Sequence, residues 1–465
     1  MNAVAQRTRS ALTTLTRSDA YRLVYVVLAI TAVVFGVSVT ASHSLALSPF
    51  DEWMYLDYLV KFPTQGYLHL GEPIGDFSMN WMACHGLQAF GSTVSPDLCG
   101  AGSFDRAAFP FGGIQTAQLY TPLYFAPTWT IAAAIQAVTG ISLLEAARFT
   151  GTIWLVATVL AIAALLRMYR VPATATIAVG LLFLATPFVW WTYTFVSTDV
   201  TGVLVGTVVV IAIERVARGR LNAWWIVPLF TVALLLKSVN AVSIGIVFVY
   251  AIVRTLSSAE RRAAWRDQTA WAAAVRGRGP ISLITGPLVA TVVALTAQLL
   301  WLRVVAASAV GAPAEFGEGR PMLWHDLVTQ IWTFVPSVFL TGVNEIGAVN
   351  RWLYPLVAIG AGLGWLCLAG VIGLVWSRTV TGTRSVAAKT ALLASIFAGP
   401  ALAVMFTLSV GEYTDLGARY GANLVGLFLL TIALLFRGTI QRRILLGLGI
   451  VLVIYVLLGT IIVVH

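Results

Sequence analysis

Long apolar segments recur along the whole chain, and they restrict its possible folds more than any other feature of the sequence. A helix of about 20 mainly apolar residues crosses the roughly 30 Å hydrocarbon core of a bilayer. Segments suited to this task lie at 21–41, 123–139, 150–169, 173–194, 200–217, 223–237, 239–253, 281–304, 353–376, 388–408, 421–437 and 444–464. Strands of a membrane barrel would instead give short alternating segments. The pattern therefore predicts an all-α polytopic membrane protein.

Charged residues are too few for a water-soluble protein of 465 residues. They make up 10% of the chain, against roughly 25% in soluble domains, and 59% of the residues are hydrophobic. This composition excludes a cytosolic enzyme, a nucleic-acid-binding protein and a disordered chain. The net charge of +10 is interpreted as a consequence of topology, since Lys and Arg concentrate in cytoplasmic loops.

The positions of the basic residues predict the topology. Basic clusters lie at 7–22, 167–170, 215–220, 254–278, 378–389 and 437–443. If all of them face the cytoplasm, segment 123–139 does not cross the bilayer and is instead a juxtamembrane or re-entrant helix on the outer side. About eleven transmembrane helices then remain, with the N-terminus in the cytoplasm and the C-terminus outside.

This topology divides the chain into successive parts. Residues 1–20 form a cytoplasmic leader, and residues 21–304 form a transmembrane module that includes a long outer loop at 42–148. Residues 305–352 form a second outer loop with an interfacial helix, and residues 353–465 form the C-terminal transmembrane helices. Most acidic residues then lie on the outer side, where we expect the functional site.

Two of the three cysteines lie in the long outer loop. Cys84 and Cys99 are free to oxidise outside the cytoplasm. We predict a disulfide between them, which stabilises a loop of this length by roughly 3 kcal/mol. The histidines have no spacing typical of zinc ligands. No metal or other cofactor is therefore expected.

Acidic residues on the outer side are candidates for catalysis. Asp51 and Glu52 follow the first apolar segment, and Asp199 lies in the short turn before segment 200–217. A carboxylate in such a position can act as a general base. For Asp51 and Glu52 the alternative is N-terminal helix capping, because acidic residues favour the first turn of a helix.

Basic residues on the same side complement these carboxylates. Lys237 ends an apolar segment, where an unpaired charge is costly, and Arg419 precedes segment 421–437. Guanidinium and ammonium groups bind phosphate, so we expect an anionic lipid headgroup near them. The alternatives are that Lys237 extends to the membrane interface and that Arg419 pairs with Glu412 or Asp415.

The order of these residues resembles that of the GT-C superfamily, membrane glycosyltransferases that use polyprenyl-phosphate sugars. The resemblance covers residues 20–255 and 417–437, but the first loop contains no Asp-x-Asp and no large soluble domain follows the spans. The matching elements are Asp51-Glu52, the stretch Tyr120–Phe125, Arg148 within Gly140–Phe149, Thr186-Pro187 followed by Asp199, Leu236-Lys237, and Gly417–Tyr420.

The resemblance implies transfer of a monosaccharide from a polyprenyl-phosphate donor to a hydroxyl of a cell-envelope glycolipid or glycan, at the outer face of a bacterial plasma membrane. Asp51 would be the general base, and Arg419 and Lys237 would bind the donor phosphate. One displacement implies inversion at the anomeric carbon, and the missing Asp-x-Asp implies independence from divalent metals. The other matched residues, expected to bind the acceptor or orient the base, are Glu52, Asp199, Arg148 and Tyr124. For Tyr124 the alternative is an aromatic anchor at the membrane interface.

Two other functions are compatible with the sequence. One is a transporter or flippase of a lipid-linked or anionic substrate, for which midplane charges, broken helices and internal repeats are typical. The other is an outer-face polysaccharide polymerase or ligase, which shares the topology and the phosphate-binding arginine. A reaction driven by ATP is not expected, because the chain has no Walker motif.

Overall fold

The described part of the chain is helical throughout. The computed structural model describes residues 17–88, 94–258, 262–314, 319–342, 345, 351–413 and 415–463, and within these ranges β structure is limited to isolated bridges. The prediction of an all-α fold is confirmed.

The helices of the first half of the chain are α2 (Arg17–Ala41), α3 (Glu52–Gln65), α4 (Asp76–His85), α5 (Pro122–Thr139), α6 (Leu143–Met168), α7 (Ala173–Leu184), α8 (Pro187–Thr194), α9 (Val200–Ala217) and α10 (Ile226–Leu236). Those of the second half are α11 (Ala241–Leu256), α13 (Gln268–Val275), α14 (Ser282–Ala307), α15 (Trp324–Ser337), α17 (Pro355–Trp376), α18 (Gly382–Val410), α19 (Val425–Leu435) and α20 (Thr439–Val463). Short 3₁₀ helices join them: η1 (Pro96–Leu98), η2 (Arg106–Ala108), η3 (Pro110–Gly113), η4 (Ala117–Leu119), η5 (Ala223–Trp225), η6 (Ser238–Asn240), η7 (Ala264–Arg266), η8 (Val338–Leu340), η9 (Arg351–Leu353) and η10 (Ala418–Leu424).

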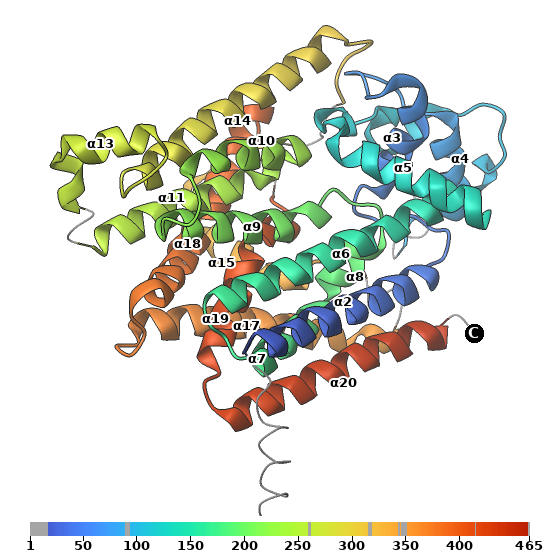
Figure 1. Ribbon diagram of the computed structural model, residues 1–465. Helices are drawn as coiled ribbons and strands as arrows, with labels where there is room; N and C mark the ends of the chain where they lie inside the picture. Colours follow the sequence, from blue (N-terminus) through green and yellow to red (C-terminus); the bar gives the residue numbers. More distant parts are fainter. Residues whose placement is uncertain are drawn as a thin grey trace, which may run out of the picture.

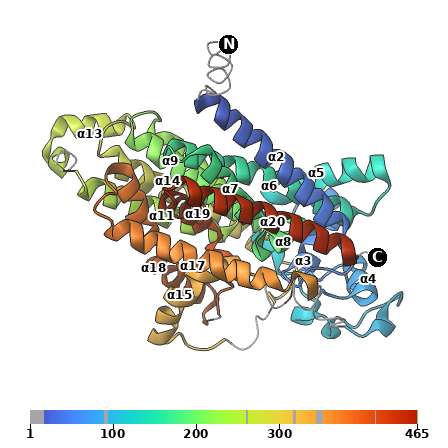
Figure 2. The same ribbon diagram turned by 90° about the horizontal axis from the view of Figure 1, so that it is seen from below.

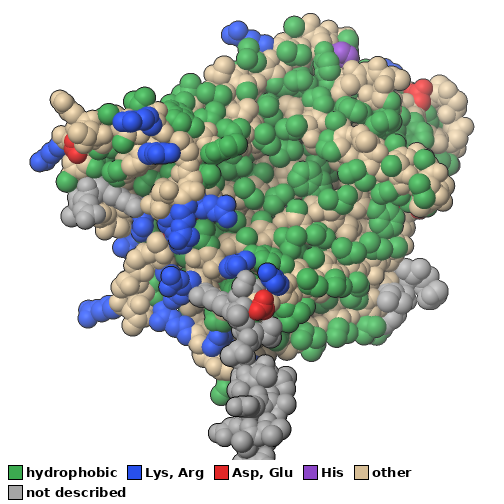
Figure 3. All heavy atoms as spheres, in the orientation of Figure 1, with side chains coloured by type: hydrophobic (Ala, Val, Ile, Leu, Met, Phe, Trp, Pro, Cys, Tyr) green, Lys and Arg blue, Asp and Glu red, His purple; other side chains and the backbone are tan. Residues whose placement is uncertain are grey.

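Most of the long helices run side by side, as Figures 1 and 2 show. One end of this bundle carries α13, and the other carries α3 and α4 (Figure 1). Among the Lys and Arg side chains visible in Figure 3, most gather toward the end that carries α13. This separation of charge fits a membrane bundle whose basic clusters share one face, which we call the basic face.

The number of spans differs from the prediction. Among the described helices, nine are long and apolar enough to cross a membrane, or ten if the bent pair of α7 and α8 counts as one span. The prediction of about eleven spans is therefore supported in part, by nine or ten candidate spans among the described helices. The difference arises at 223–237, where η5 and α10 give an apolar helix over Ala223–Leu236 only. At 1.5 Å per residue such a helix is roughly 20 Å long, less than the roughly 30 Å of a bilayer core.

The segment predicted at 173–194 is broken in the middle. Its halves, α7 and α8, are bent by 69° relative to each other. Pro187 occupies the first turn of α8, where its missing N–H is not needed, and the Thr186 hydroxyl caps α8 by accepting from the Val189 amide. Every residue of α8 is buried, so the break lies inside the protein.

The centre of the bundle is formed by α9 together with η10 and α19, while α14 and α20 lie at its periphery. Nearly all side chains of α19 are buried against α9, α17 and neighbouring helices. In contrast, Leu299 of α14 and Ile444 and Val451 of α20 are largely exposed. Apolar residues on the outside as well as the inside are expected where lipid is the solvent.

The loop between α2 and α6 is a folded unit. Cys84 at the end of α4 and Cys99 after η1 form a disulfide, the pairing predicted from the sequence. Lys61 of α3 lies 2.9 Å from both Asp57 and Glu72, which ties α3 to the segment before α4. By length and hydropathy α5 is not among the candidate spans, as expected for a juxtamembrane helix. These contacts join α3, α4 and the segments around them into one unit.

Candidate functional site

Asp51 precedes α3 in an unusual backbone conformation. Its φ of 65° and ψ of 7° lie in the left-handed region, which few residues other than glycine adopt. Its side chain makes no capping hydrogen bond to α3, so the capping alternative does not describe Asp51. Backbone strain of this kind is concentrated at functional sites, where the surrounding structure maintains it.

The Asp51 side chain instead begins a row of four alternating charges. Its Oδ2 lies 2.6 Å from Nη2 of Arg419, and Nε of Arg419 lies 3.5 Å from Oδ2 of Asp199. The other oxygen of Asp199, Oδ1, lies 2.5 Å from Nζ of Lys237. We call these four residues the charge cluster. Arg419 therefore pairs with carboxylates that are distant in the sequence, and not with Glu412 or Asp415.

The turns around the spans bring these charges together. Asp199 directly precedes α9, Lys237 links α10 to η6, and Arg419 lies in the first turn of η10. Asp199 is fixed by its neighbour Ser197, whose hydroxyl donates to the carboxylate and accepts from the Asp199 amide. Each charged side chain is thus placed at the end of a helix.

Aromatic rings surround the two cations. Nζ of Lys237 lies 5.7 Å from the ring centre of Tyr120 and 5.5 Å from that of Tyr420. The guanidinium carbon of Arg419 lies 5.4 Å from the ring centre of Phe50 and 5.5 Å from that of Tyr420. Ring faces attract cations, and more strongly where water is excluded. The aromatic rings thus stabilise both cations without adding negative charge to the site.

The buried half of the cluster stays ionised. Burial alone raises the pKa of Asp199, but Lys237 and Arg419 outweigh it and hold the pKa below its ordinary value. Burial likewise lowers the pKa of Lys237, but Asp199 reverses this effect and the pKa is raised. Both shifts favour the charged forms. Lys237 is therefore a paired cation, and its side chain, 3% exposed, does not extend to the interface.

Exposure increases along the charge cluster from Lys237 to Asp51. The Lys237 and Asp199 side chains are 3% and 6% exposed, whereas Arg419 is 15% and Asp51 34% exposed. Nε of Arg419 is buried and has no hydrogen-bond partner among the described residues, since its distance to Asp199 exceeds normal hydrogen-bond geometry. An incoming molecule thus meets Asp51 and Arg419 first.

A polar cavity of about 470 Å³ opens beside Arg419. Phe50 lies on one side of it, and two carboxylates, Glu345 and Asp415, contribute further polar lining. Carboxylates accept hydrogen bonds from hydroxyl groups. The remaining lining residues are Pro49, Leu340, Thr341, Gly342, Gly417, Ala418 and Tyr420.

Glu52 and Arg148 form a second, fully buried ion pair behind Asp51. Nε and Nη2 of Arg148 donate to the two oxygens of Glu52 at 2.9 and 2.8 Å. Glu52 also accepts from the amides of Ser48 and Val196, and Arg148 also donates to the carbonyls of Ser44 and Ala46. Both side chains are at most 1% exposed. This pair fixes the chain on both sides of Asp51 to α6 and to the turn before α9.

Tyr124 lies apart from the cavity. Its side chain is 1% exposed and packs against Phe125 and Trp154 in the interior. Tyr55 contacts the turn before α9: its hydroxyl is 3.0 Å from that of Thr198, next to Asp199. The structure thus joins Asp51, Asp199, Lys237 and Arg419 and leaves Tyr124 outside that group.

Two buried asparagines that sequence reasoning missed support the charge cluster. Nδ2 of Asn423 donates to Gly202 of α9 and to Oδ1 of Asn240, at 3.0 Å each. Asn240 in turn donates to Thr201 at 3.1 Å. Asn240 follows Lys237 and Asn423 follows Arg419 within about one helical turn. A polar residue within an apolar segment, which typically marks hydrogen bonding between helices, was the available signal.

Neither a protein family nor a curated protein with significant similarity to this chain is found. Among the described residues, no three His, Cys, Asp or Glu side chains are placed so that they would hold a metal ion. What the charge cluster offers chemically is a partly exposed carboxylate in contact with a guanidinium, with a buried ion pair behind them. These groups are suited to removing a proton and to binding an anion.

Proposed function

We propose that this chain is a glycosyltransferase of the GT-C type, which transfers a monosaccharide from a polyprenyl-phosphate donor to an acceptor hydroxyl at the outer face of a plasma membrane. The observation that carries the proposal is the contact between Asp51 and Arg419, whose side chain lines a polar cavity. It combines a candidate base on a strained backbone with a candidate phosphate ligand.

Arg419 is the proposed ligand of the donor phosphate. A guanidinium has five N–H donors in a planar fork, and Asp51 uses only one of the nitrogens, Nη2. Charge grows on the phosphate oxygen as the glycosidic bond breaks, so fixed positive charge at this point lowers the barrier. Lys237 is bonded to Asp199 and almost fully buried, so we assign it the role of holding Asp199 and Arg419 in place.

Asp51 is the proposed general base. When a phosphate binds Arg419, it competes with the Asp51 carboxylate and releases it toward the acceptor. Asp51 then takes the proton of the acceptor hydroxyl while that oxygen bonds to the anomeric carbon. The bond from this carbon to the phosphate oxygen breaks, and polyprenyl phosphate leaves with the electron pair. A single displacement of this kind inverts the anomeric centre.

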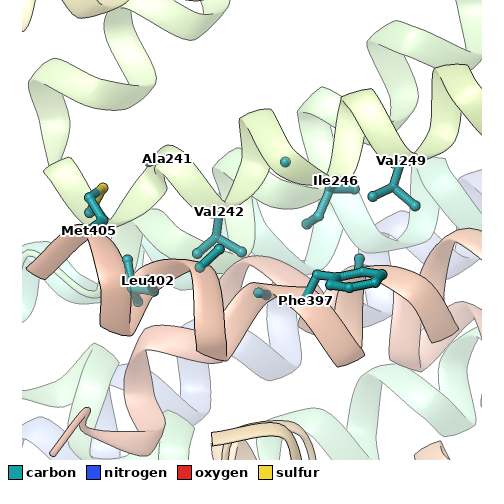
Figure 4. A pocket seen from close by; sticks show the side chains of 11 residues that line it. Ala241, Val242, Ile246, Val249, Phe397, Leu402 and Met405 are labelled. Atoms are coloured by element: carbon teal, nitrogen blue, oxygen red, sulfur yellow. The ribbon is translucent and has the colours of Figure 1, made fainter. Parts of the chain in front are cut away.

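An apolar groove close to Lys237 is suited to the lipid part of such a donor. Figure 4 shows it between α11 and α18, where it has a volume of about 250 Å³ and is lined by side chains such as Val242, Phe397 and Met405. It begins at Ala241, the first residue of α11 and four positions after Lys237. A prenyl chain in this groove would carry its phosphate toward the charge cluster.

The remaining candidate residues support the base and the acceptor. Glu52 and Arg148 are saturated with hydrogen bonds, so we assign them the positioning of Asp51. The carboxylates of Glu345 and Asp415 in the cavity are proposed to accept hydrogen bonds from acceptor hydroxyls. A contact between Tyr124 and the acceptor stays a prediction. No step in this scheme involves a divalent metal.

The test is sugar transfer by the purified protein in detergent. Radiolabelled polyprenyl-phosphate mannose or arabinose is supplied with a pool of envelope lipids, with and without EDTA. Asp51→Asn keeps the left-handed backbone accessible, since Asn tolerates it, and is expected to lower the rate about 10²- to 10⁴-fold. Asp97→Asn, an exposed change in the same loop, is the control. Full activity of Asp51→Asn would exclude Asp51 as the base.

A transporter or flippase is the second candidate, and the bent pair of α7 and α8 favours it, since broken helices are typical of transporters. Reconstituted vesicles distinguish the two functions. Movement of a labelled polyprenyl-phosphate sugar across the bilayer without transfer of the sugar would support the transporter. A polymerase or ligase would transfer a lipid-linked glycan in the same assay, so the size of the labelled product identifies it.

A further inference from the structure

A pocket of about 500 Å³ on the basic face is formed where α6 and α9 end. It lies at the opposite end of α9 from the charge cluster, since Asp199 precedes the first residue of α9 and the arginines lie in or just after the last turns of α6 and α9. Its lining combines apolar side chains of the spans with guanidinium groups from the helix ends and the turns that follow them. The lining residues are Tyr25, Ala164, Arg167, Met168, Arg170, Ile211, Arg215, Arg218 and Arg220.

Most of these guanidinium groups lack a carboxylate partner. Arg218 pairs with Glu214, whose Oε1 lies 2.6 Å from its Nε. Arg167 lies over the ring of Tyr21, 5.5 Å from its centre. Within the described part of the chain no Asp or Glu forms an ion pair with Arg167, Arg170, Arg215 or Arg220. The pocket is therefore lined by more guanidinium groups than carboxylates can neutralise.

Arg170 occupies a position that favours glycine. α6 ends with hydrogen bonds from the Arg170 amide to the Arg167 carbonyl and from the Val171 amide to the Leu166 carbonyl, which is the Schellman pattern. Arg170 has the left-handed φ of 60° that this pattern requires. α9 ends with the same pattern, but there the left-handed residue is Gly219, with φ 68°. At the end of α6, Arg170 lines the pocket although its left-handed backbone conformation is strained for a residue other than glycine.

Membrane topology alone does not account for this arrangement. The positive-inside preference requires basic residues near the ends of spans, and it does not require them to meet around one cavity. The partial negative charge at the C-terminal ends of α6 and α9 reduces the mutual repulsion of the arginines, but each helix end carries only about half an elementary charge. The unpaired guanidinium groups are therefore suited to bind an anion.

We propose that this pocket binds the headgroup of an anionic phospholipid from the leaflet that contacts the basic face. The apolar part of the lining favours a lipid over a soluble phosphate. Ala164 and Met168 of α6 and Ile211 of α9 belong to membrane spans and lie in the same pocket as the arginines. A headgroup phosphate reaches the guanidinium groups while its acyl chains lie along these residues. The site is independent of the proposed transferase function.

The experiment is a titration of purified protein in a nonionic detergent with dioleoylphosphatidylglycerol. Binding is followed by native mass spectrometry and by the melting temperature. We expect saturable binding that raises the melting temperature, and no such effect of dioleoylphosphatidylcholine. Sodium pyrophosphate is the third arm, because it supplies phosphate without acyl chains. If pyrophosphate produces the same shift at the same concentration, the pocket binds a soluble anion and the lipid assignment is wrong.

Arg170→Gly is the most informative variant. It removes a guanidinium and relieves the left-handed strain, so we expect the lipid-free protein to keep or raise its melting temperature. Affinity for the lipid is expected to fall about fivefold for each guanidinium removed, in Arg170→Gly and again in Arg170→Gly/Arg215→Ala. Arg443→Ala, an exposed change near the start of α20, is the matched control. Equal weakening in Arg443→Ala would show general surface attraction and overturn the proposal.

Discussion

The carboxylate of Asp51 lies 2.6 Å from the guanidinium of Arg419, although the two residues are 368 positions apart in the sequence. The contact joins the first loop to the turn that leads into α19. Because Arg419 also approaches Asp199, which is bonded to Lys237, one contact links the exposed part of the site to its buried part. A change at Arg419 is therefore transmitted to Asp51.

Replacing Arg419 by Lys tests the guanidinium fork directly. The variant keeps one positive charge next to Asp51 and Asp199 but has no planar fork to engage a carboxylate and a phosphate together. We expect kcat/KM for a polyprenyl-phosphate sugar to fall about 10²-fold, the loss typical for one fixed transition-state donor. Steady-state kinetics measure it.

The control for this change is Arg437→Lys, which alters an exposed arginine that donates to Thr379. Its kinetics are expected to match those of the unmodified protein. If Arg419→Lys also retains full kcat/KM, the phosphate ligand has to be sought elsewhere in the cavity.

Removing the charge of Asp199 leaves Lys237 buried without its partner. Breaking a buried ion pair by changing one member costs about 3–5 kcal/mol. Asp199→Asn is therefore expected to lower the melting temperature strongly. Asp199→Asn/Lys237→Met removes both charges and is expected to recover much of the stability without recovering transfer activity. Thermal unfolding and the transfer assay together separate the two effects.

The matched comparison for that pair of variants is Asp57→Asn in the first loop, where Lys61 retains Glu72 as a second partner. A smaller loss of stability is expected there. A double variant at 199 and 237 that is as unstable as Asp199→Asn would mean that the charge of Lys237 is not what destabilises the single variant.

The sequence predicts which charged residues share this site, but it does not predict which of them form ion pairs. The apolar segments and basic clusters predict the spans, and they place Asp51, Asp199, Lys237 and Arg419 on one side of the bilayer. The sequence offers Glu412 or Asp415 as the partner of Arg419, because it shows only local neighbours. Its actual partners are supplied by the first loop and by the turn before α9.

The differences between the predicted and the observed helices have physical causes in particular segments. The apolar character of 223–237 indicates burial in lipid or protein, but it does not determine whether so short a helix spans the bilayer alone. At Thr186-Pro187 the sequence is compatible with either a kink or a break, and the buried cap on α8 decides for a break. The left-handed backbone of Asp51 is not predictable from the sequence. An acidic residue at this position indicates only that a helix begins nearby, whatever its own backbone conformation.

The ionised state of Asp199 and Lys237 predicts a pH range for their contribution to stability. The pKa of Asp199 is lowered on folding, so its contribution is present above about pH 4, the unfolded value, and is lost as the pH falls through the folded value. The pKa of Lys237 is raised, so its contribution is complete below about pH 10 and is lost as the pH rises through the folded value. Between about pH 5 and pH 9 the pair contributes fully.

The measurement is the difference in melting temperature between the unmodified protein and Asp199→Asn/Lys237→Met. We expect this difference to be constant from about pH 5 to pH 9 and to change on acidification below about pH 4 and on alkalinisation above about pH 10. Using the difference cancels the titration of all other groups. A difference that already changes at pH 6 would contradict an ionised pair.

Gly245 offers a test of the apolar groove between α11 and α18. It lines the groove, and a Cβ at this position meets no atom within 4 Å, so a larger side chain fits without a clash. Gly245→Leu is expected to fill part of the groove while favouring the helix, since glycine is a poor helix former. If a prenyl chain occupies the groove, KM for a long-chain polyprenyl-phosphate sugar rises about tenfold, the effect of losing roughly 1.4 kcal/mol of binding. The value of kcat stays unchanged because the charge cluster is intact.

A short-chain donor provides the internal control for this variant. A sugar linked to a phosphate with only two prenyl units does not extend along the groove, so its KM is expected to be the same for Gly245→Leu and the unmodified protein. Gly362→Leu on α17, where a Cβ also meets no atom within 4 Å, is the matched substitution outside the groove. A rise in KM that is equal for long and short donors would place the lipid chain elsewhere, because only a chain that reaches Gly245 can distinguish the two substrates.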